Sequence, residues 1–323
     1  VGSEMCIRDS FMSKWVKKNY PDVKSDLCTC FIERGFNLAK DRGYSAMVTM
    51  ASWMFLSSFE AMRRRVLDSK SIVSMCYMGH MVMRIAFNTS ATVFANCRTN
   101  SLGSYCRIEA KDLDAAGNPV SFSAGESEFY RRDAETFKQI PGTPIAYWLS
   151  EKYGHMFELG TMKSAYVSGG RLKTHDNEKY VRNWWEVPAS LIGRLWMPLS
   201  NGGGFSRWSG MKYDVVNWSD EANDFYDQHG GLPKSGSIER KGICWGLITS
   251  GRCSFRVKDQ GELFTSGAPT VFMSNQDSER ALSIDLAFLN SSIASELLDA
   301  INPTLNTTVG DVLSLPMPPS SAV

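Results

Sequence analysis

The sequence lacks any long hydrophobic run. Its most apolar stretch, Val48 to Leu56, is interrupted by Thr49 and Ser52, whereas a membrane-spanning helix needs about 20 predominantly apolar residues. The first ten residues also lack the apolar core of a signal peptide. They resemble a translated sequencing-adapter artefact, so we expect a non-native segment over residues 1–10, native sequence from Phe11, and a soluble protein without a membrane span.

Metal and disulfide signatures are missing as well. Eight cysteines occur without one Cys-x-x-Cys pair, and a chain of 36.0 kDa needs no disulfide to fold. We therefore expect reduced thiols and a cytoplasmic location. The four histidines, at positions 80, 155, 175 and 229, are far apart, and none has a His or Cys neighbour at ligand spacing. The sequence predicts no metal site.

The fingerprints of nucleotide-binding loops and of serine hydrolases are also absent. The glycine-rich segment Asn201 to Phe205 is not followed by Gly-Lys-Ser or Gly-Lys-Thr. No Gly-x-Gly-x-x-Gly or Gly-x-Ser-x-Gly occurs. The triple arginine at positions 63–65 is interpreted as the solvated face of a helix.

Positive charge is concentrated in one part of the chain. Residues 161–258 contain 14 Lys or Arg against 9 Asp or Glu, a balance of +5, whereas residues 259–323 contain 1 against 8. Such an excess is compatible with phosphate contacts, because Lys and Arg displace condensed counterions from nucleic acids. A solvated surface explains it nearly as well.

The first third of the chain alternates helical and strand patterns. Helical spacing predicts a helix from Asp26 to Asp41, and the following apolar segment predicts a strand over Tyr44 to Met50. Ser57 to Glu60 matches a capping box opening a helix through Leu67. Further strands are expected at residues 72–77, 91–97 and 105–109. This alternation predicts an α/β fold with a largely parallel, doubly wound sheet.

The remainder of the chain has a different pattern. Residues 110–142 turn polar, with Gly117-Asn-Pro119 and a serine-rich stretch at 121–127, and are interpreted as a domain linker. Beyond them, short segments separated by glycines favour irregular α+β structure. The last predicted element is one helix from Ala281 to Ala300.

Basic and aromatic residues recur together in this second part. Aromatic faces beside cations suit nucleic acids, because bases stack on rings while phosphates pair with charge, although tryptophans also anchor cores. The pairs are Arg182 with Trp184 and Trp185, Arg194 with Trp196, Arg207 with Trp208, Lys212 with Trp218, and Lys241 with Trp245.

Three blocks of sequence resemble the family of large adenine-specific DNA methyltransferases of BREX phage-defence systems, relatives of the fused type IIG restriction-modification enzymes. The first block contains Lys17-Lys-Asn-Tyr-Pro-Asp-Val-Lys-Ser-Asp26, Phe31-Ile-Glu-Arg-Gly35 and Val48-Thr-Met-Ala-Ser-Trp-Met-Phe-Leu-Ser57; the second contains Ile140-Pro-Gly-Thr-Pro-Ile-Ala-Tyr-Trp148, Gly170-Arg-Leu-Lys-Thr-His-Asp-Asn177 and Val181-Arg-Asn-Trp-Trp-Glu-Val187; the third contains Asn302-Pro-Thr-Leu-Asn-Thr-Thr-Val-Gly-Asp311 and Leu315-Pro316. Together they cover most of residues 11–316.

The resemblance implies a fragment of a site-specific enzyme that transfers a methyl group from S-adenosylmethionine to adenine N6, in phage defence or restriction-modification. In that family an Asn-Pro-Pro-Tyr loop grips the flipped adenine, and it lies shortly before the segment that resembles Lys17 to Asp26. The motif does not occur in this sequence. We therefore expect that the fragment retains DNA recognition, lacks the catalytic loop and the cofactor motif, and is inactive alone.

On this interpretation, residues 11–109 are the distal half of a Rossmann-like methyltransferase sheet, and residues 143–323 are an α+β target-recognition domain that binds double-stranded DNA. The segment Asn88 to Phe94 resembles the family motif that borders the adenine pocket, which makes Phe87, Asn88 and Thr89 candidates for that border. The candidate DNA-binding residues are Lys173, Arg182, Trp184, Arg194, Arg207, Trp208, Lys212 and Lys241.

Two alternatives remain open from the sequence. The chain could be a non-catalytic DNA-specificity module that acts with another subunit, or an unrelated enzyme with a divergent site. Other defence-system proteins are further candidate partners. An upstream reading frame without Asn-Pro-Pro-Tyr would favour the module, and turnover of a small substrate would favour the unrelated enzyme.

Overall fold

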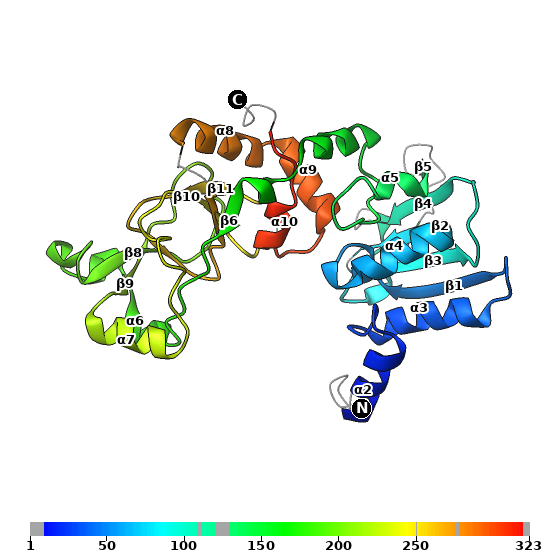
Figure 1. The fold of residues 1–323 in the computed structure, drawn as a ribbon, viewed down its shortest axis with the longest axis horizontal. Coiled ribbons are helices and arrows are strands. Elements are labelled where there is room, and N and C mark those ends of the chain that lie inside the picture. Colours follow the sequence, from blue (N-terminus) through cyan, green and yellow to red (C-terminus); the bar gives the residue numbers. More distant parts are fainter. Residues whose placement is uncertain are drawn as a thin grey trace. The chain divides into compact units, whose positions relative to one another are not determined.

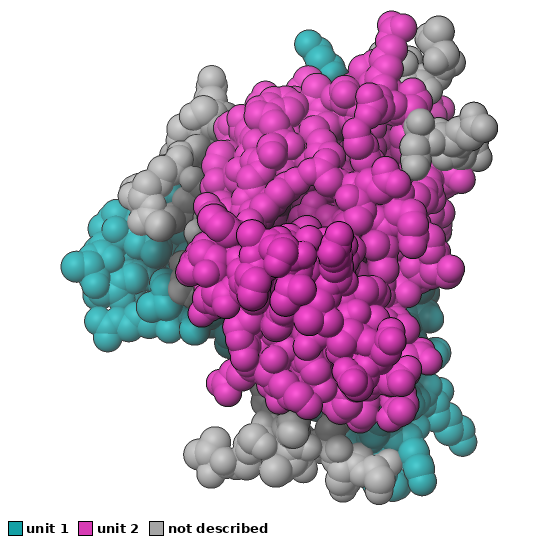
Figure 2. Space-filling view, turned by 90° about the vertical axis from the view of Figure 1, so that its left-hand side faces the viewer, with its two compact units in different colours: residues 1–154 teal, residues 155–323 magenta. Residues whose placement is uncertain are grey.

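The computed structural model describes residues 10–79, 81–108, 112–120, 129–249, 251–274 and 278–318. His80, nearly all of the predicted non-native segment and the serine-rich stretch 121–127 lie outside these ranges. The chain divides into two compact units, residues 1–154 and 155–323 (Figure 2). The predicted second domain begins at residue 143, whereas the second unit begins at residue 155. Strand and helix residues of the predicted linker, 110–142, belong to the first unit.

Helices and strands alternate at the start of the first unit, and consecutive strands follow (Figure 1). In chain order they are α2 (Ser10–Asn19), α3 (Leu27–Leu38), β1 (Tyr44–Met50), η1 (Ala51–Met54), η2 (Ser57–Phe59), α4 (Glu60–Ser69), β2 (Ser71–Met78), η3 (Val82–Arg84), β3 (Thr89–Ala95), β4 (Gly103–Ile108), β5 (Phe129–Arg132) and α5 (Ala134–Phe137).

The predicted helices at the start of this unit are present, with one error in how they begin. Asp26 caps α3, because its Oδ1 accepts the N–H of Cys28 at 2.9 Å. The predicted capping box at Ser57 is wrong. Ser57 to Phe59 instead form the 3-10 turn η2, and α4 begins at Glu60 without a side-chain cap.

The five-stranded sheet has the order β1-β3-β2-β4-β5. Only the β2–β4 pair is parallel, so the expectation of a largely parallel sheet is wrong. The reason is local: β2 returns into β3 without a crossover helix, and a parallel connection requires one. Because α4 connects β1 to β2, however, β1, β2 and β4 run in the same direction and their carboxyl ends share one edge.

The core of the first unit lies between this sheet and its helices. Side chains of α3 and α4 pack with Trp53 and with Phe94 of β3 in one buried cluster. Arg63 belongs to this interior, so the expectation of a solvated triple arginine is wrong for Arg63, whereas Arg64 and Arg65 are exposed. Its guanidinium donates from Nη1 to the Trp53 carbonyl at 2.8 Å and from Nη2 to the Gly142 carbonyl at 2.6 Å. The carbonyls that surround its guanidinium allow this cationic residue to be buried in the core.

The second unit consists of short strands and helices. They are η5 (Glu151–Leu159), within which the division between the units falls, η6 (Met162–Ser164), β6 (Tyr166–Ser168), α6 (Asn177–Tyr180), β7 (Val181–Asn183), η7 (Trp184–Glu186), η8 (Ala189–Leu191), β8 (Trp196–Ser200), β9 (Asp214–Asn217), α7 (Asp220–Gln228), β10 (Gly242–Trp245), β11 (Phe255–Lys258), β12 (Leu263–Phe264), β13 (Thr270–Met273), α8 (Glu279–Leu289), α9 (Ser292–Ile301) and α10 (Val309–Leu313).

Two four-stranded sheets organise this unit, with the orders β11-β10-β13-β6 and β12-β8-β9-β7. The single predicted helix over residues 281–300 is wrong, since α8 and α9 are separated at Asn290 and Ser291 and bend by 68°. Ser291 caps α9 by accepting the Ala294 N–H at 3.2 Å. Within the described ranges, no single helix is long and apolar enough to cross a membrane; this bent pair meets the criterion only when both helices are taken together.

Candidate nucleic-acid interface

The structure divides the predicted aromatic and basic pairs into buried and exposed groups. Trp245 is fully buried in β10, and its Nε1 donates to the Thr307 carbonyl at 2.8 Å. Trp218 packs against the cluster around Tyr226. Trp245 is therefore a core residue that offers no ring for stacking beside Lys241, and the partly buried Trp218 offers only part of its ring beside Lys212.

Trp184 and Trp208, by contrast, are exposed, together with Trp185. Trp184 begins the turn η7, directly after β7, and its backbone N–H donates to the Tyr213 carbonyl at 2.8 Å. This bond ties the turn to the residues that precede β9. Aromatic rings that remain exposed on an ordered backbone are available to stack on a ligand.

Three of the candidate cations already have partners. Arg182 donates from Nη1 to the carbonyls of Glu178 and Val181. Lys212 forms an ion pair with Asp259, and Lys241 forms one with Glu279. Partial burial lowers the pKa of Lys212, but the hydrogen bond with Asp259 and the charge of Glu262 outweigh it and hold that pKa above its ordinary value. These three side chains would have to exchange partners to bind phosphate.

Lys173, Arg194 and Arg207 are the better candidates. The side chains of Lys173 and Arg194 are exposed and make no hydrogen bond or ion pair within the described part of the chain. The guanidinium of Arg207 lies 5.3 Å from the centre of the Phe205 ring. A cation held over an aromatic face keeps its charge and its donors for a further partner.

Sequence reasoning missed two residues near Trp208. Phe205 is the last residue of the glycine-rich segment, and its ring is exposed. A glycine-rich segment suggests a phosphate-binding loop, and that motif gives no information about an aromatic side chain beside it. Arg256 is buried in β11, with one long hydrogen bond from Nη2 to the Gly202 carbonyl at 3.4 Å. Its Nε and Nη1 have no partner among the described residues. No sequence signal distinguishes this buried arginine from an exposed one.

In the first unit, the predicted pocket-border residues lie where β3 begins, at the edge that holds the carboxyl ends of β1 and β2. Phe87 is exposed, and the Asn88 carbonyl accepts the Ala51 N–H at 2.9 Å. Thr89 is buried and pairs with Met50 and Met78. The carboxyl edge is the usual ligand-binding side of open α/β sheets. Phe87 is therefore available for contact there, whereas Thr89 is a sheet residue.

The loop before Phe87 has an unusual backbone. Met81, Met83 and Arg84 adopt left-handed conformations, with φ between 55° and 67°, which non-glycine residues adopt rarely. Hydrogen bonds to the turn at residues 114–118 hold them. The Met83 N–H donates to the Gly117 carbonyl at 2.7 Å, and Arg84 Nε donates to the Ala116 carbonyl at 2.8 Å. The turn thus fixes the backbone of the loop that leads into β3.

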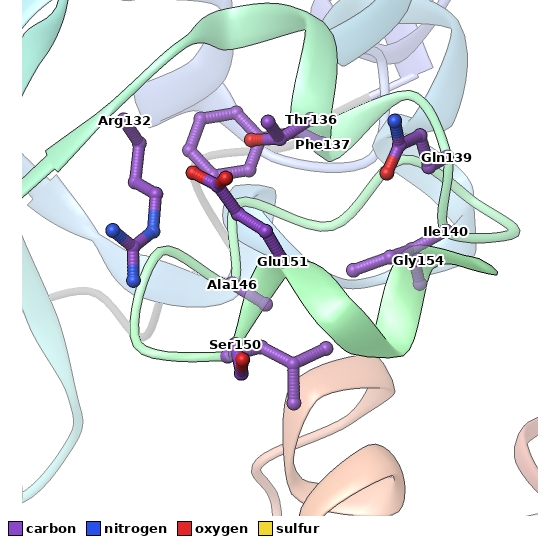
Figure 3. Close-up of a pocket in the computed structure, with 10 residues that line it drawn as sticks. Arg132, Thr136, Phe137, Gln139, Ile140, Ala146, Ser150, Glu151 and Gly154 are labelled. Carbon is purple, nitrogen blue, oxygen red and sulfur yellow. The ribbon is translucent and has the colours of Figure 1, made fainter. Parts of the chain in front are cut away.

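A separate hollow in the first unit is shown in Figure 3. Apolar side chains such as Phe137 and Ile140 line it, together with Arg132 and Glu151. The residues that line this hollow include no histidine, lysine or cysteine that could act as a nucleophile or activate one. Across the described ranges, no group of three or more His, Cys, Asp or Glu residues could hold a metal ion. The exposed aromatic and basic residues of the second unit therefore form the candidate site.

Comparison with known proteins places this site in context. Residues 4–82 match the Eco57I restriction-modification methylase family. Over 95% of its length, the chain is 31% identical to the adenine-specific methyltransferase PglX of Lacticaseibacillus casei (strain Zhang) and covers 28% of it. It is 29% identical to the adenine-specific methyltransferase BrxX of Escherichia coli O9:H4 (strain HS), again over 95% of this chain, and covers 26% of that protein. The chain thus spans little more than a quarter of these relatives.

Distant similarity to solved structures also exists. The type IIL restriction-modification enzyme MmeI in complex with DNA matches with a TM-score of 0.46 and 8% identity, over 85% of this chain and 45% of that one. The DrdV–DNA complex matches with a TM-score of 0.45 and 10% identity, over 98% of this chain and 41% of the other.

Proposed function

We propose, from the confirmed resemblance of nearly the whole chain to adenine-specific DNA methyltransferases of BREX and restriction-modification type, that the second unit recognises double-stranded DNA for methylation of adenine N6. One observation carries the proposal. Ordered aromatic rings, Trp184 and Trp208 above all, are exposed in the same unit as cations that lack an acidic partner, Lys173 and Arg194. Cations pair with phosphates, and exposed rings can contact bases, so both kinds of side chain suit a nucleic-acid-binding surface.

The methyl donor in this family is S-adenosylmethionine, and nucleoside riboses are commonly held by a carboxylate at the carboxyl edge of an open α/β sheet. The segments that follow β1 and β2, residues 51–59 and residues 79 and 81–88, contain no carboxylate, whereas the segment that follows β4 contains Asp112 and Asp114. Two of the three strands whose carboxyl ends share this edge thus offer no group for the ribose. In the proposal, Phe87 at this edge borders the adenine, and the other requirements of methyl transfer are met by parts of the enzyme outside these 323 residues.

A salt titration tests the proposal. Duplex affinity of the wild-type chain should fall steeply with salt, because each phosphate contact contributes about 0.9 to the slope of log affinity against log salt. Lys173→Ala, Arg194→Ala and Arg207→Ala should each flatten the slope by about this amount. Lys212→Ala should have a smaller effect, since Asp259 competes for its ammonium.

Lys163→Ala is the matched control, because Lys163 is exposed in the same unit but is not a candidate. Its slope should equal that of the wild type. Unchanged affinity and slope in all three alanine variants would show that these cations do not contact DNA. Absence of any duplex binding by the wild-type chain would refute the proposal itself.

A further inference from the structure

The loop between β8 and β9, residues 201–213, concentrates exposed aromatic rings. Phe205 is 61% exposed, Trp208 is 52% exposed and Tyr213 is 56% exposed. Large apolar side chains gathered on one surface segment indicate an interaction site, because their exposure to water is unfavourable. The loop is thus a candidate contact surface in its own right.

The backbone of this loop is anchored at both ends of its aromatic part. The Trp208 N–H donates to the Phe255 carbonyl at 2.9 Å, and the Val257 N–H donates to the Trp208 carbonyl at 3.0 Å. At the other end, Gly202 has φ +87°, and a Cβ there would lie 2.3 Å from the Gly267 carbonyl oxygen. The rings are therefore presented on an ordered support, which reduces the entropy lost on binding.

The charge of the loop favours an anionic partner. Residues 201–213 contain Arg207 and Lys212 but no Asp or Glu. Behind the loop, the buried guanidinium of Arg256 approaches the Gly202 carbonyl, with two of its nitrogens unpartnered within the described residues. A buried cation that is incompletely paired leaves positive potential at the surface above it. Arg207 lies over the Phe205 ring and Trp208 pairs with Arg256, so both aromatic residues have a cationic neighbour.

We propose that residues 201–213 form an aromatic wedge that enters the DNA duplex. Phe205 and Trp208 stack on the bases of one step and unstack it in part, while Arg207 holds a flanking phosphate. This inference rests on the proposed function. It assigns to the loop a contact with bases rather than with the backbone alone.

Aromatic, Met and Arg side chains are enriched in protein interfaces as well as in nucleic-acid-binding surfaces, so the charge of the loop decides between the two partners. Residues 201–213 contain no Asp or Glu. Rings interleaved with cations, without acids, match the alternation of base and phosphate in a nucleic acid. The duplex is therefore the favoured occupant.

The test uses a fluorescein-labelled duplex and the same duplex with a central mismatch. A wedge must break base stacking, and a mismatch has already lost part of it, so the wild-type chain should bind the mismatched duplex about tenfold more tightly. Phe205→Ala and Trp208→Ala should remove this preference and bind the mismatched duplex at least fivefold more weakly than the wild type. Phe205→Tyr, which keeps the ring, should retain the preference.

Leu305→Ala is the control, because Leu305 is as exposed as Phe205, at 61%, and lies outside the loop. It should bind both duplexes as the wild type does. Equal binding of the two duplexes by the wild type, or unchanged binding by both alanine variants, would overturn the wedge and leave duplex recognition intact. A wild-type chain that binds neither duplex would refute the proposed function and the wedge with it.

Discussion

The side-chain amide of Asn290 forms both hydrogen bonds that a neighbouring strand would form with Phe255. Its Oδ1 accepts the Phe255 N–H at 3.0 Å, and its Nδ2 donates to the Phe255 carbonyl at 2.9 Å. Phe255 begins β11, the edge strand of its sheet. One side chain at the end of α8 thus forms hydrogen bonds with the edge strand of the sheet, at the residue where the helix ends.

Asn290→Ala should lower the free energy of unfolding by about 1–3 kcal/mol, because it leaves the buried Phe255 N–H without a partner, whereas the Phe255 carbonyl keeps the Trp208 N–H. Urea unfolding measures the loss, and hydrogen exchange should locate it in β10 and β11. Gln228→Ala, an exposed position in the same unit, should change stability by less than about 0.5 kcal/mol. Equal stability of the two variants would contradict this role for Asn290.

Arg63→Met and Arg64→Met form a second matched pair. Burial lowers the pKa of Arg63 to about 10, yet several carbonyls hold its guanidinium. Its replacement should cost roughly 3 kcal/mol or more, since those buried carbonyls lose charged donors. Arg64 is exposed and pairs with Glu60, so its loss should cost at most about 1 kcal/mol. Thermal unfolding of both variants distinguishes these outcomes, and similar losses would show that Arg63 is not a core residue.

The free energy of unfolding should depend on pH because of Lys258. Its Nζ donates to the Ser237, Ile238 and Arg240 carbonyls, but burial lowers its pKa from 10.5 to about 8 despite the opposing charge of Glu262. Between these values the unfolded chain binds more protons at this site than the folded chain. This residue's contribution to stability should therefore increase as pH rises from 8, by up to roughly 3 kcal/mol over the whole window.

The measurement for Lys258 is the difference in unfolding free energy between the wild type and Lys258→Met at pH 7.5 and pH 9.5. Other groups that titrate in this range are common to both proteins, and their contributions cancel in the difference unless, like the thiol of Cys244, they interact with Lys258 itself. The difference should move in favour of the wild type at the higher pH. A constant difference would show that Lys258 titrates normally.

The polypeptide should not bind S-adenosylmethionine tightly and should not methylate DNA alone. The sequence contains no Asn-Pro-Pro-Tyr, and the segments after β1 and β2 lack a carboxylate. Isothermal titration calorimetry should detect no micromolar affinity for the cofactor, with the full-length PglX relative titrated in parallel as the positive control. Micromolar binding by the 323-residue chain would require a cofactor site that these residues were not expected to form.

The sequence by itself determined the local elements whose residues carry their own signals. The helix after Asp26 and the strand from Tyr44 to Met50 follow from hydrophobic spacing and a capping side chain. The resemblance to adenine-specific methyltransferases likewise came from blocks of sequence. These features depend on residues near one another in the chain, so they could be predicted without the fold.

The tertiary structure alone decided where partners distant in the chain meet. The antiparallel insertion of β3, the burial of Arg63 by carbonyls 79 and 80 residues away, and the helix break at Asn290 each depend on such contacts. The candidate site divides in the same way. Composition predicted the basic and aromatic residues, but burial separated the core residue Trp245 from the exposed Trp208, because residue type does not determine which tryptophans the core has room to enclose.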